Sequence, residues 1–292
     1  MAAAVEERGG WRLRRGVAPY VLLFPGFAWL LAFYVWPMVQ MFFIALQEGS
    51  LERGYQLTWN WSMYGEVFSR YSTQLVRSVE YGLIVTVACL MIGYPLAYFI
   101  AVYGGRWKNV LLFMVILPFF VSFLIRTLMW RLTLADNGFV LGTIKDLGLL
   151  PDDFRVLATP FAVLAGLTYS FLPFMTLPLY ASLEKLDRSL LEAAQDLYSS
   201  RRTAFLKVTL PLSLPGVFAG SLLTFIPAVG DFVNPLFLGG PGERLIGNVI
   251  QQRMLVSNDY PEGAALSFIL MAAILIGVFI YARILGSEEL TG

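Results

Sequence analysis

The sequence predicts an all-α membrane protein with six transmembrane helices, and its composition and pattern support this fold class. Of the 292 residues, 58% are hydrophobic and only 14% are charged, whereas soluble domains carry about a quarter of charged residues. The apolar residues gather in blocks, and each block reaches the ~20 residues that a helix needs to cross the hydrocarbon core. Polar segments separate the blocks, so the chain is expected to cross the membrane several times.

Six apolar blocks are long enough to be spans. They cover residues 17–46, 75–103, 110–130, 157–183, 208–238 and 264–285. Residues 17–46 form a retained first span, because this run is too long for a signal peptide and no small-residue cleavage site follows it. Residues 17–285 are therefore expected to form one six-span domain. A short helix is expected on the outer side within residues 242–260, where Leu245, Val249 and Ile250 recur at helical spacing.

The basic residues predict the orientation of the chain. Arg8, Arg12, Arg14 and Arg15 precede the first span, and Lys and Arg are enriched in cytoplasmic segments. We therefore expect residues 1–16 to be a cytoplasmic N-terminal segment. With six spans, residues 286–292 then form a cytoplasmic tail.

The residue inventory argues against an enzyme. The chain has no histidine and a single cysteine, Cys89, within an apolar run, so a histidine-based metal site or acid–base pair is excluded. Neither a phosphate-binding GxxxxGK[ST] loop nor a GxSxG nucleophile motif occurs. No catalytic residue, metal site or cofactor is predicted, and no basic aromatic patch favours nucleic-acid binding.

One polar segment between the fourth and fifth predicted spans stands out. It reads EAAQDLYSSRRTAFLKVTLPLSLPG and covers residues 192–216. Ser189 and Glu192 have the spacing of a capping box. Apolar residues in the same segment recur on one helical face. A short amphipathic helix along the cytoplasmic surface is therefore predicted. A helix that only anchors the loop at the lipid headgroups is the alternative, but its face would favour Lys and Arg rather than acids.

The spacing Glu192-Ala193-Ala194, followed by Val208-x-Leu210-Pro211, resembles the EAA loop of ABC importer permeases. This resemblance implies the type I ABC importer permease fold, with residues 184–207 as the coupling loop and its helix docked on a cytoplasmic ATPase. Tyr198 stands where the family has glycine. The implied ATPase-coupling residues are Ser189, Glu192, Ala193, Ala194, Asp196, Leu197 and Tyr198.

Further stretches are similar to spermidine/putrescine permeases. They are LPFFVSFLIRTLMW (residues 117–130), the DNG that follows at 136–138, and GDFVNPLFLGGPG (residues 230–242). Ferric-ion, thiamine and sulfate permeases share parts of these patterns, so another small solute stays open as an alternative substrate. An ion-gradient-driven secondary transporter is a further alternative, but it predicts internal repeats and midplane ionisable residues that the sequence lacks.

The resemblance also implies the surroundings of the chain. It places the protein in a prokaryotic inner membrane, within the lipid bilayer. The implied partners are an ABC ATPase dimer that binds ATP and Mg²⁺, a second homologous permease subunit and an extracytoplasmic substrate-binding protein. The chain itself would bind no cofactor.

Charged residues inside predicted spans are candidates for the substrate pathway, since burying them in a bilayer is costly. Asp231 is the main candidate, because a carboxylate beside Phe225 or Phe232 could hold an ammonium group. A salt bridge from Asp231 to Arg126 or Arg131 that only ties helices together is the alternative, and Arg126 is otherwise expected to snorkel to the surface. The full set of candidate pathway residues is Asp231, Phe232, Phe225, Glu80 and Tyr94.

Overall fold

The computed structural model describes residues 18–187, 189 and 200–285, and its only strands within these ranges form one hairpin. Strands β1 (Gln47–Ser50) and β2 (Gly54–Leu57) pair antiparallel just after the first span. The sequence analysis did not predict this hairpin. Within the described ranges, five helices are long and apolar enough to cross a membrane, or six if one sharply bent pair counts as a single span. The predicted all-α membrane fold is therefore confirmed.

Four of the six predicted spans are long helices close to the expected positions. The first consists of α1 (Ala18–Leu30) and α2 (Trp36–Ala45), joined by a π-helical turn. The second, α3 (Ser62–Tyr98), begins well before residue 75 and is kinked at Tyr71, whose φ of −115° and ψ of 16° are not helical. The other two are α7 (Pro160–Glu184) and α13 (Tyr260–Leu285).

The third predicted span is broken. Helix α4 (Lys108–Ile116) ends in a 3₁₀ turn at Leu117–Phe120, and α5 (Phe123–Leu134) continues at an angle of 92°. The expectation of one continuous helix over residues 110–130 was therefore wrong. Pro118 has no backbone N–H to donate, and both residues between the turn and α5 have extended ψ values near 135°. The chain then forms the short helix α6 (Phe139–Asp146).

The fifth predicted span is also shorter than expected. Helix α9 (Arg201–Ala204) leads through a π-helical turn into α10 (Leu210–Gly230), which ends eight residues before Leu238. Asp231 is extended, with ψ of 129°, and a separate helix α11 (Val233–Leu238) follows. The helix predicted within residues 242–260 is confirmed as α12 (Ile246–Gln251) and the π-helical turn after it, and its place on the outer side stays a prediction.

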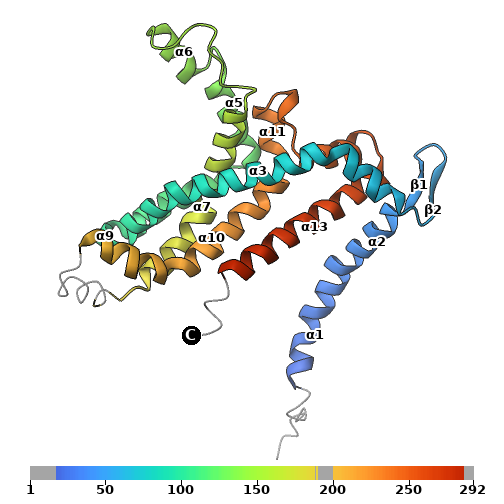
Figure 1. Cartoon of the computed structure of the whole chain (residues 1–292), viewed down its shortest axis with the longest axis horizontal. Coiled ribbons are helices and arrows are strands. Elements are labelled where there is room, and N and C mark those ends of the chain that lie inside the picture. Colours follow the sequence, from blue (N-terminus) through green and yellow to red (C-terminus); the bar gives the residue numbers. More distant parts are fainter. Residues whose placement is uncertain (1–17, 188, 190–199, 286–292) are drawn as a thin grey trace, which may run out of the picture.

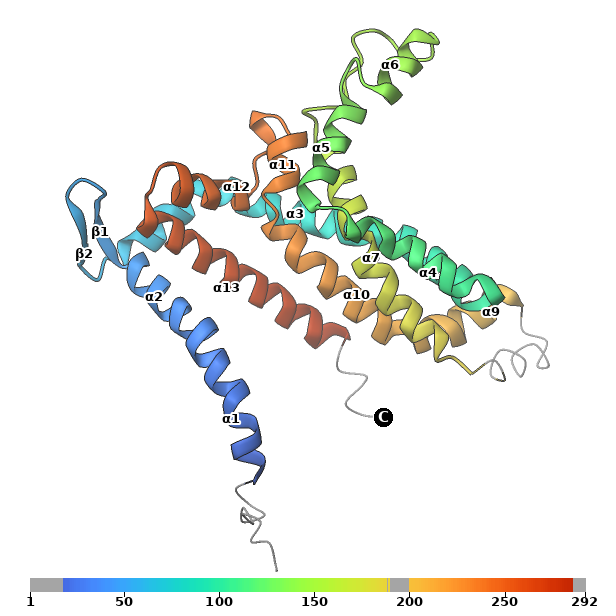
Figure 2. The same cartoon turned by 180° about the vertical axis from the view of Figure 1, so that it is seen from behind.

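Helices α3, α7 and α10 form the centre of the bundle (Figures 1 and 2). Helix α13 lies beside them, whereas α1 extends away from the other helices as an exposed apolar rod. In both views the hairpin and α9 lie at opposite ends of the long axis, and α6 extends away from the long helices on the side opposite to α1. The breaks after α4 and α10 bring α5 and α11 into contact.

Candidate functional site

A cavity of about 710 Å³ lies where the break between α4 and α5 meets the end of α10. Helices α5, α7, α10 and α11 all contribute to it. Most of its large side chains are aromatic, and two are charged. These residues are Phe119, Phe120, Phe123, Phe171, Phe174 and Phe232, together with Arg126 and Asp231. The two irregular segments of the bundle thus line one open, aromatic cavity whose wall contains one acid and one base.

Asp231 is buried in the wall of this cavity, with 8% of its surface exposed. Its carboxylate accepts hydrogen bonds from the backbone N–H groups of Val233 (2.6 Å) and Asn234 (3.1 Å), and from the Asn234 side-chain amide (2.8 Å). These donors are neutral, and they begin α11 in the manner of a helix cap. No ion pair joins Asp231 to Arg126 or Arg131 in the part of the chain that the structure describes. The alternative of a helix-tying salt bridge is therefore not observed.

Arg126 faces the same cavity from α5. Its guanidinium lies over the rings of Phe119 and Phe123, with its central carbon 5.2 Å and 5.6 Å from their centroids. The Nε and Nη1 atoms are buried and have no hydrogen-bond partner. Only part of the side chain reaches solvent in this structure, and snorkelling of Arg126 to the membrane surface stays a prediction.

Three other predicted pathway residues lie elsewhere. The hydroxyl of Tyr94 shares a hydrogen bond of 2.7 Å with Ser213, and its ring packs 5.7 Å from that of Phe205 in the helical core. Phe225 packs in the cluster between α3 and α13, and Glu80 is exposed on α3. Of the candidate set, only Asp231 and Phe232 line the cavity.

Sequence reasoning missed the aromatic wall of the cavity. Phe119, Phe120 and Phe123 lie in an apolar run that looked like continuous helix. Pro118 within that run was the available signal for a break, but several other spans also contain proline and continue as helix.

Helix α12 holds the end of α10 in place. The Asn248 side-chain amide donates to the Phe232 carbonyl at 2.7 Å. Gly247 lies so close to Gly230 that an added Cβ would be 2.5 Å from the Gly230 carbonyl oxygen. The outer helix therefore contacts the backbone of both residues that flank Asp231.

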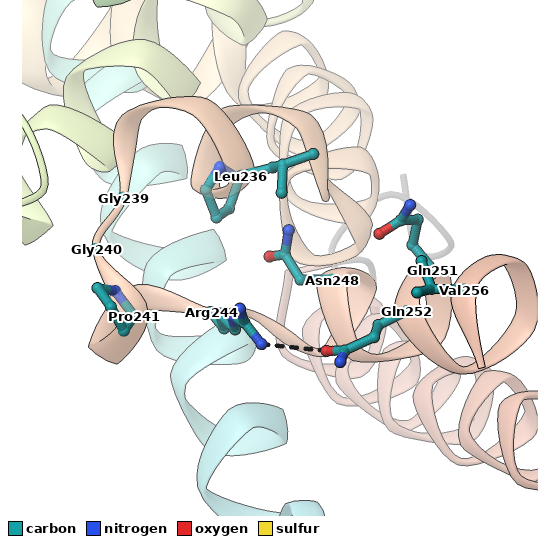
Figure 3. A pocket seen from close by; sticks show the side chains of 10 residues that line it. Leu236, Gly239, Gly240, Pro241, Arg244, Asn248, Gln251, Gln252 and Val256 are labelled. Atoms are coloured by element: carbon teal, nitrogen blue, oxygen red, sulfur yellow. Dashed lines mark hydrogen bonds between the residues drawn. The ribbon is translucent and has the colours of Figure 1, made fainter.

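A second hollow of about 490 Å³ opens between α11 and α12 (Figure 3). It is lined by Leu236, Asn248, Gln251 and other residues, and Arg244 donates to Gln252 across it at 3.1 Å. This hollow is lined by both polar and apolar side chains, and it shares no lining residue with the aromatic cavity. Asn248 contributes to this hollow and also holds Phe232, so the two sites share a supporting side chain.

Most predicted ATPase-coupling residues lie outside the described residues: Glu192, Ala193, Ala194, Asp196, Leu197 and Tyr198. Ser189 is described, and its backbone N–H donates to the Asp187 carboxylate at 2.9 Å. This hydrogen bond lowers the pKa of Asp187. Before the loop, Glu184 at the end of α7 pairs with Lys108 of α4 at 2.5 Å, so the start of the loop is fastened to the third span.

Solved structures support the fold. A chain of a bacterial ABC transporter involved in the import of the acidic polysaccharide alginate matches with a TM-score of 0.69 and 18% identity, covering 95% of this chain and 97% of that one. A chain of the MetNI methionine ABC transporter in an inward-facing conformation matches with a TM-score of 0.58 and 16% identity, covering 74% and 94%. The helical arrangement is therefore that of ABC importer permeases.

Sequence comparison identifies the family. Residues 93–286 match the binding-protein-dependent transport system inner membrane component. The spermidine/putrescine transport system permease protein PotB of Haemophilus influenzae is 37% identical over 88% of this chain and 90% of that protein. The PotB protein of Escherichia coli is 41% identical over 73% and 78%. The chain therefore belongs to the binding-protein-dependent inner membrane components and is the permease subunit of an ABC importer.

Proposed function

We propose that this permease carries a polyamine and that Asp231 and Phe232 contact its ammonium groups during passage. The observation that carries the proposal is a buried carboxylate in an aromatic cavity, with no cationic partner among the described residues. Similarity to the two PotB proteins supports the same substrate class.

The chemistry of the cavity suits an organic cation. Aromatic ring faces attract ammonium groups within about 6 Å of their centroids, and Phe232 is 41% exposed at the cavity wall. The hydrogen-bond donors to the Asp231 carboxylate are neutral, so none of the described cationic side chains competes with a ligand for it in this structure. The volume of about 710 Å³ also falls in the range of small-molecule sites.

The chain supplies half of the pathway in this proposal. A second, homologous permease subunit supplies the other half, an ABC ATPase dimer binds ATP and Mg²⁺, and an extracytoplasmic binding protein delivers the substrate. The chain binds no cofactor itself. Family membership and the alginate transporter crystallised with its periplasmic protein support this assembly.

Residues 184–207 would couple the ATPase to the bundle. Residues 1–16 and 286–292 would face the cytoplasm, and residues 17–285 would cross the inner membrane. ATP-driven movement of the helix at Glu192 would reach the cavity through α10, which connects this loop directly to Asp231. Alternating access then requires elements with two arrangements, and the breaks before α5 and after α10 are suitable hinges.

The test is uptake of radiolabelled spermidine by the complete transporter in proteoliposomes, with Asp231→Asn against the wild type. Asparagine keeps the shape and removes the charge, so uptake should fall about tenfold, as expected for loss of a charge-assisted contact. The complex should still assemble. Asp153→Asn, an exposed acid outside the cavity, is the matched control and should transport normally.

Two results would contradict the proposal. Normal spermidine uptake by Asp231→Asn would remove this carboxylate from the pathway. A wild-type transporter that takes up ferric ion, thiamine or sulfate but no polyamine would refute the substrate class and leave the permease role intact.

A further inference from the structure

Arg126 is a partly buried cation that the proposed pathway does not use. Its Nε and Nη1 atoms have no hydrogen-bond partner, and its only described favourable contacts are the faces of Phe119 and Phe123. Buried guanidinium nitrogens without an acceptor are costly, and native proteins rarely keep them. These two nitrogens therefore need an acceptor that the described residues do not supply in this arrangement.

The nearest candidate is in the same cavity. Asp231 lines it together with Arg126, and its carboxylate is held only by neutral donors from Val233 and Asn234. The cavity thus contains one acid and one base, and neither forms an ion pair with any residue that the structure describes. An arginine and a carboxylate pair strongly when they meet, through charge-assisted hydrogen bonds.

Both residues sit beside breaks in their helices. Arg126 is in the first turns of α5, directly after the 92° bend. Asp231 occupies the extended position between α10 and α11. No continuous helix connects α4 to α5 or α10 to α11. A small rotation at either break would therefore change the distance between Arg126 and Asp231.

We propose that Arg126 is a specificity-determining residue that competes with the substrate for Asp231. In the unloaded transporter the guanidinium pairs with the Asp231 carboxylate and closes the cavity. A polyamine ammonium displaces it, and Arg126 then moves onto Phe119 and Phe123, the two rings that its guanidinium faces in this structure. The inference rests on the proposed function, since it takes Asp231 to be the amine contact.

This competition gives a selectivity mechanism. A cation must replace the intramolecular guanidinium, which is attached to the protein and has a high effective concentration. A monoamine replaces the single positive charge of the guanidinium with a single ammonium charge and makes no additional contact. A polyamine carries further ammonium groups that the remaining aromatic faces can bind, so it competes more effectively.

The test is equilibrium binding of tritiated spermidine to the complete transporter in nanodiscs, without binding protein, in wild type, Arg126→Gln and Arg126→Lys. Removing the competitor should tighten spermidine binding about tenfold in Arg126→Gln, whereas Arg126→Lys keeps a competing cation and should bind like wild type. A merely structural arginine would give weaker binding or none. Arg131→Gln is the matched control, because Arg131 is exposed on the same helix and outside the cavity.

A second background separates this inference from the proposed function. Spermidine binding should be weaker in Asp231→Asn than in the wild type. The double variant Asp231→Asn/Arg126→Gln should then bind no more tightly than Asp231→Asn alone. Unchanged binding in Asp231→Asn would refute both proposals. Weakened binding in Asp231→Asn with no tightening in Arg126→Gln would refute only the competition.

A third variant keeps the test decisive if Arg126→Gln does not assemble. Arg126→Met keeps the length of the side chain in an aromatic wall and should tighten binding in the same way. Failure of both variants to assemble, while Arg131→Gln assembles, would show that Arg126 is structural and would overturn the inference.

Discussion

Glu262 is a buried acid whose charge is neutralised by two arginines from different parts of the chain. Only 5% of its side chain is exposed, and its oxygens lie 3.0 Å from Arg70 and 3.3 Å from Arg253. Arg253 also donates to the Tyr71 hydroxyl at 2.6 Å. Tyr71 is the kink residue of α3, so this network fastens the kink to the start of α13.

Glu262→Gln is expected to destabilise the protein. Glutamine keeps the shape but leaves Arg253 without its counter-ion, and we expect a loss of about 1–3 kcal/mol, since both arginines are partly exposed. The midpoint of thermal unfolding of the purified transporter in detergent measures this loss of stability. Glu52→Gln, which changes an exposed acid of the hairpin turn, is the control, and equal midpoints for the two variants would contradict the assignment.

At the residue scale, sequence reasoning could find Asp231 but not its surroundings. A carboxylate within an apolar run is visible in the sequence, because its burial is costly. That Arg126 turns inward depends on the bend at Val121 and Ser122, which brings Phe119 and Phe123 around it. Tyr94 and Phe225 lie in apolar runs as well, yet tertiary packing places them in the core. Only the folded chain distinguishes these cases.

Helices α7 and α10 approach each other closely through two glycines. A Cβ on Gly216 would lie 2.6 Å from the Cβ of Ser182 and 2.8 Å from the Pro178 carbonyl oxygen. A Cβ on Gly220 would meet the sulfur of Met175 at 2.8 Å. Small residues four positions apart let backbones pack closely in membrane helices, and here they join the helices on either side of the coupling loop.

Gly216→Ala is therefore expected to destabilise the bundle. One methyl group cannot fit beside a backbone carbonyl without separating the helices, and overpacking of this kind costs about 1–3 kcal/mol. Gly65→Ala is the matched control in α3, since a Cβ there meets nothing within 4 Å and alanine favours helix. Thermal unfolding should show a lower midpoint for Gly216→Ala and an unchanged or higher one for Gly65→Ala. The reverse order would contradict the packing.

At the element scale, the apolar blocks predicted the long helices well, because bilayer thickness sets their length. They did not predict the two breaks. Apolar residues continue on both sides of residues 121–122 and of Asp231, so the apolar blocks alone did not mark either break. The breaks arise from backbone geometry at Pro118 and from the Asp231 carboxylate, which caps α11.

At the scale of the whole molecule, a large apolar surface is left exposed, as expected for one subunit of a membrane assembly. Helix α1 is apolar, and its described large side chains are mostly exposed to the surroundings. Membership of the ABC importer permeases settles the class of transporter, and the alternative of an ion-gradient-driven secondary transporter was wrong. Sequence reasoning reached the family because the EAA spacing is local, whereas the cavity needs four helices at once.

ATPase activity and uptake, measured together on the reconstituted transporter, test the central claim most directly. Binding protein loaded with spermidine should stimulate both, and binding protein loaded with an unrelated solute should stimulate neither. Glu192→Lys should leave membrane insertion intact and reduce uptake per ATP hydrolysed by about tenfold or more, since it reverses a charge at the proposed coupling site. Stimulation only by another solute, or normal coupling in Glu192→Lys, would contradict this account of a polyamine permease driven through residues 184–207.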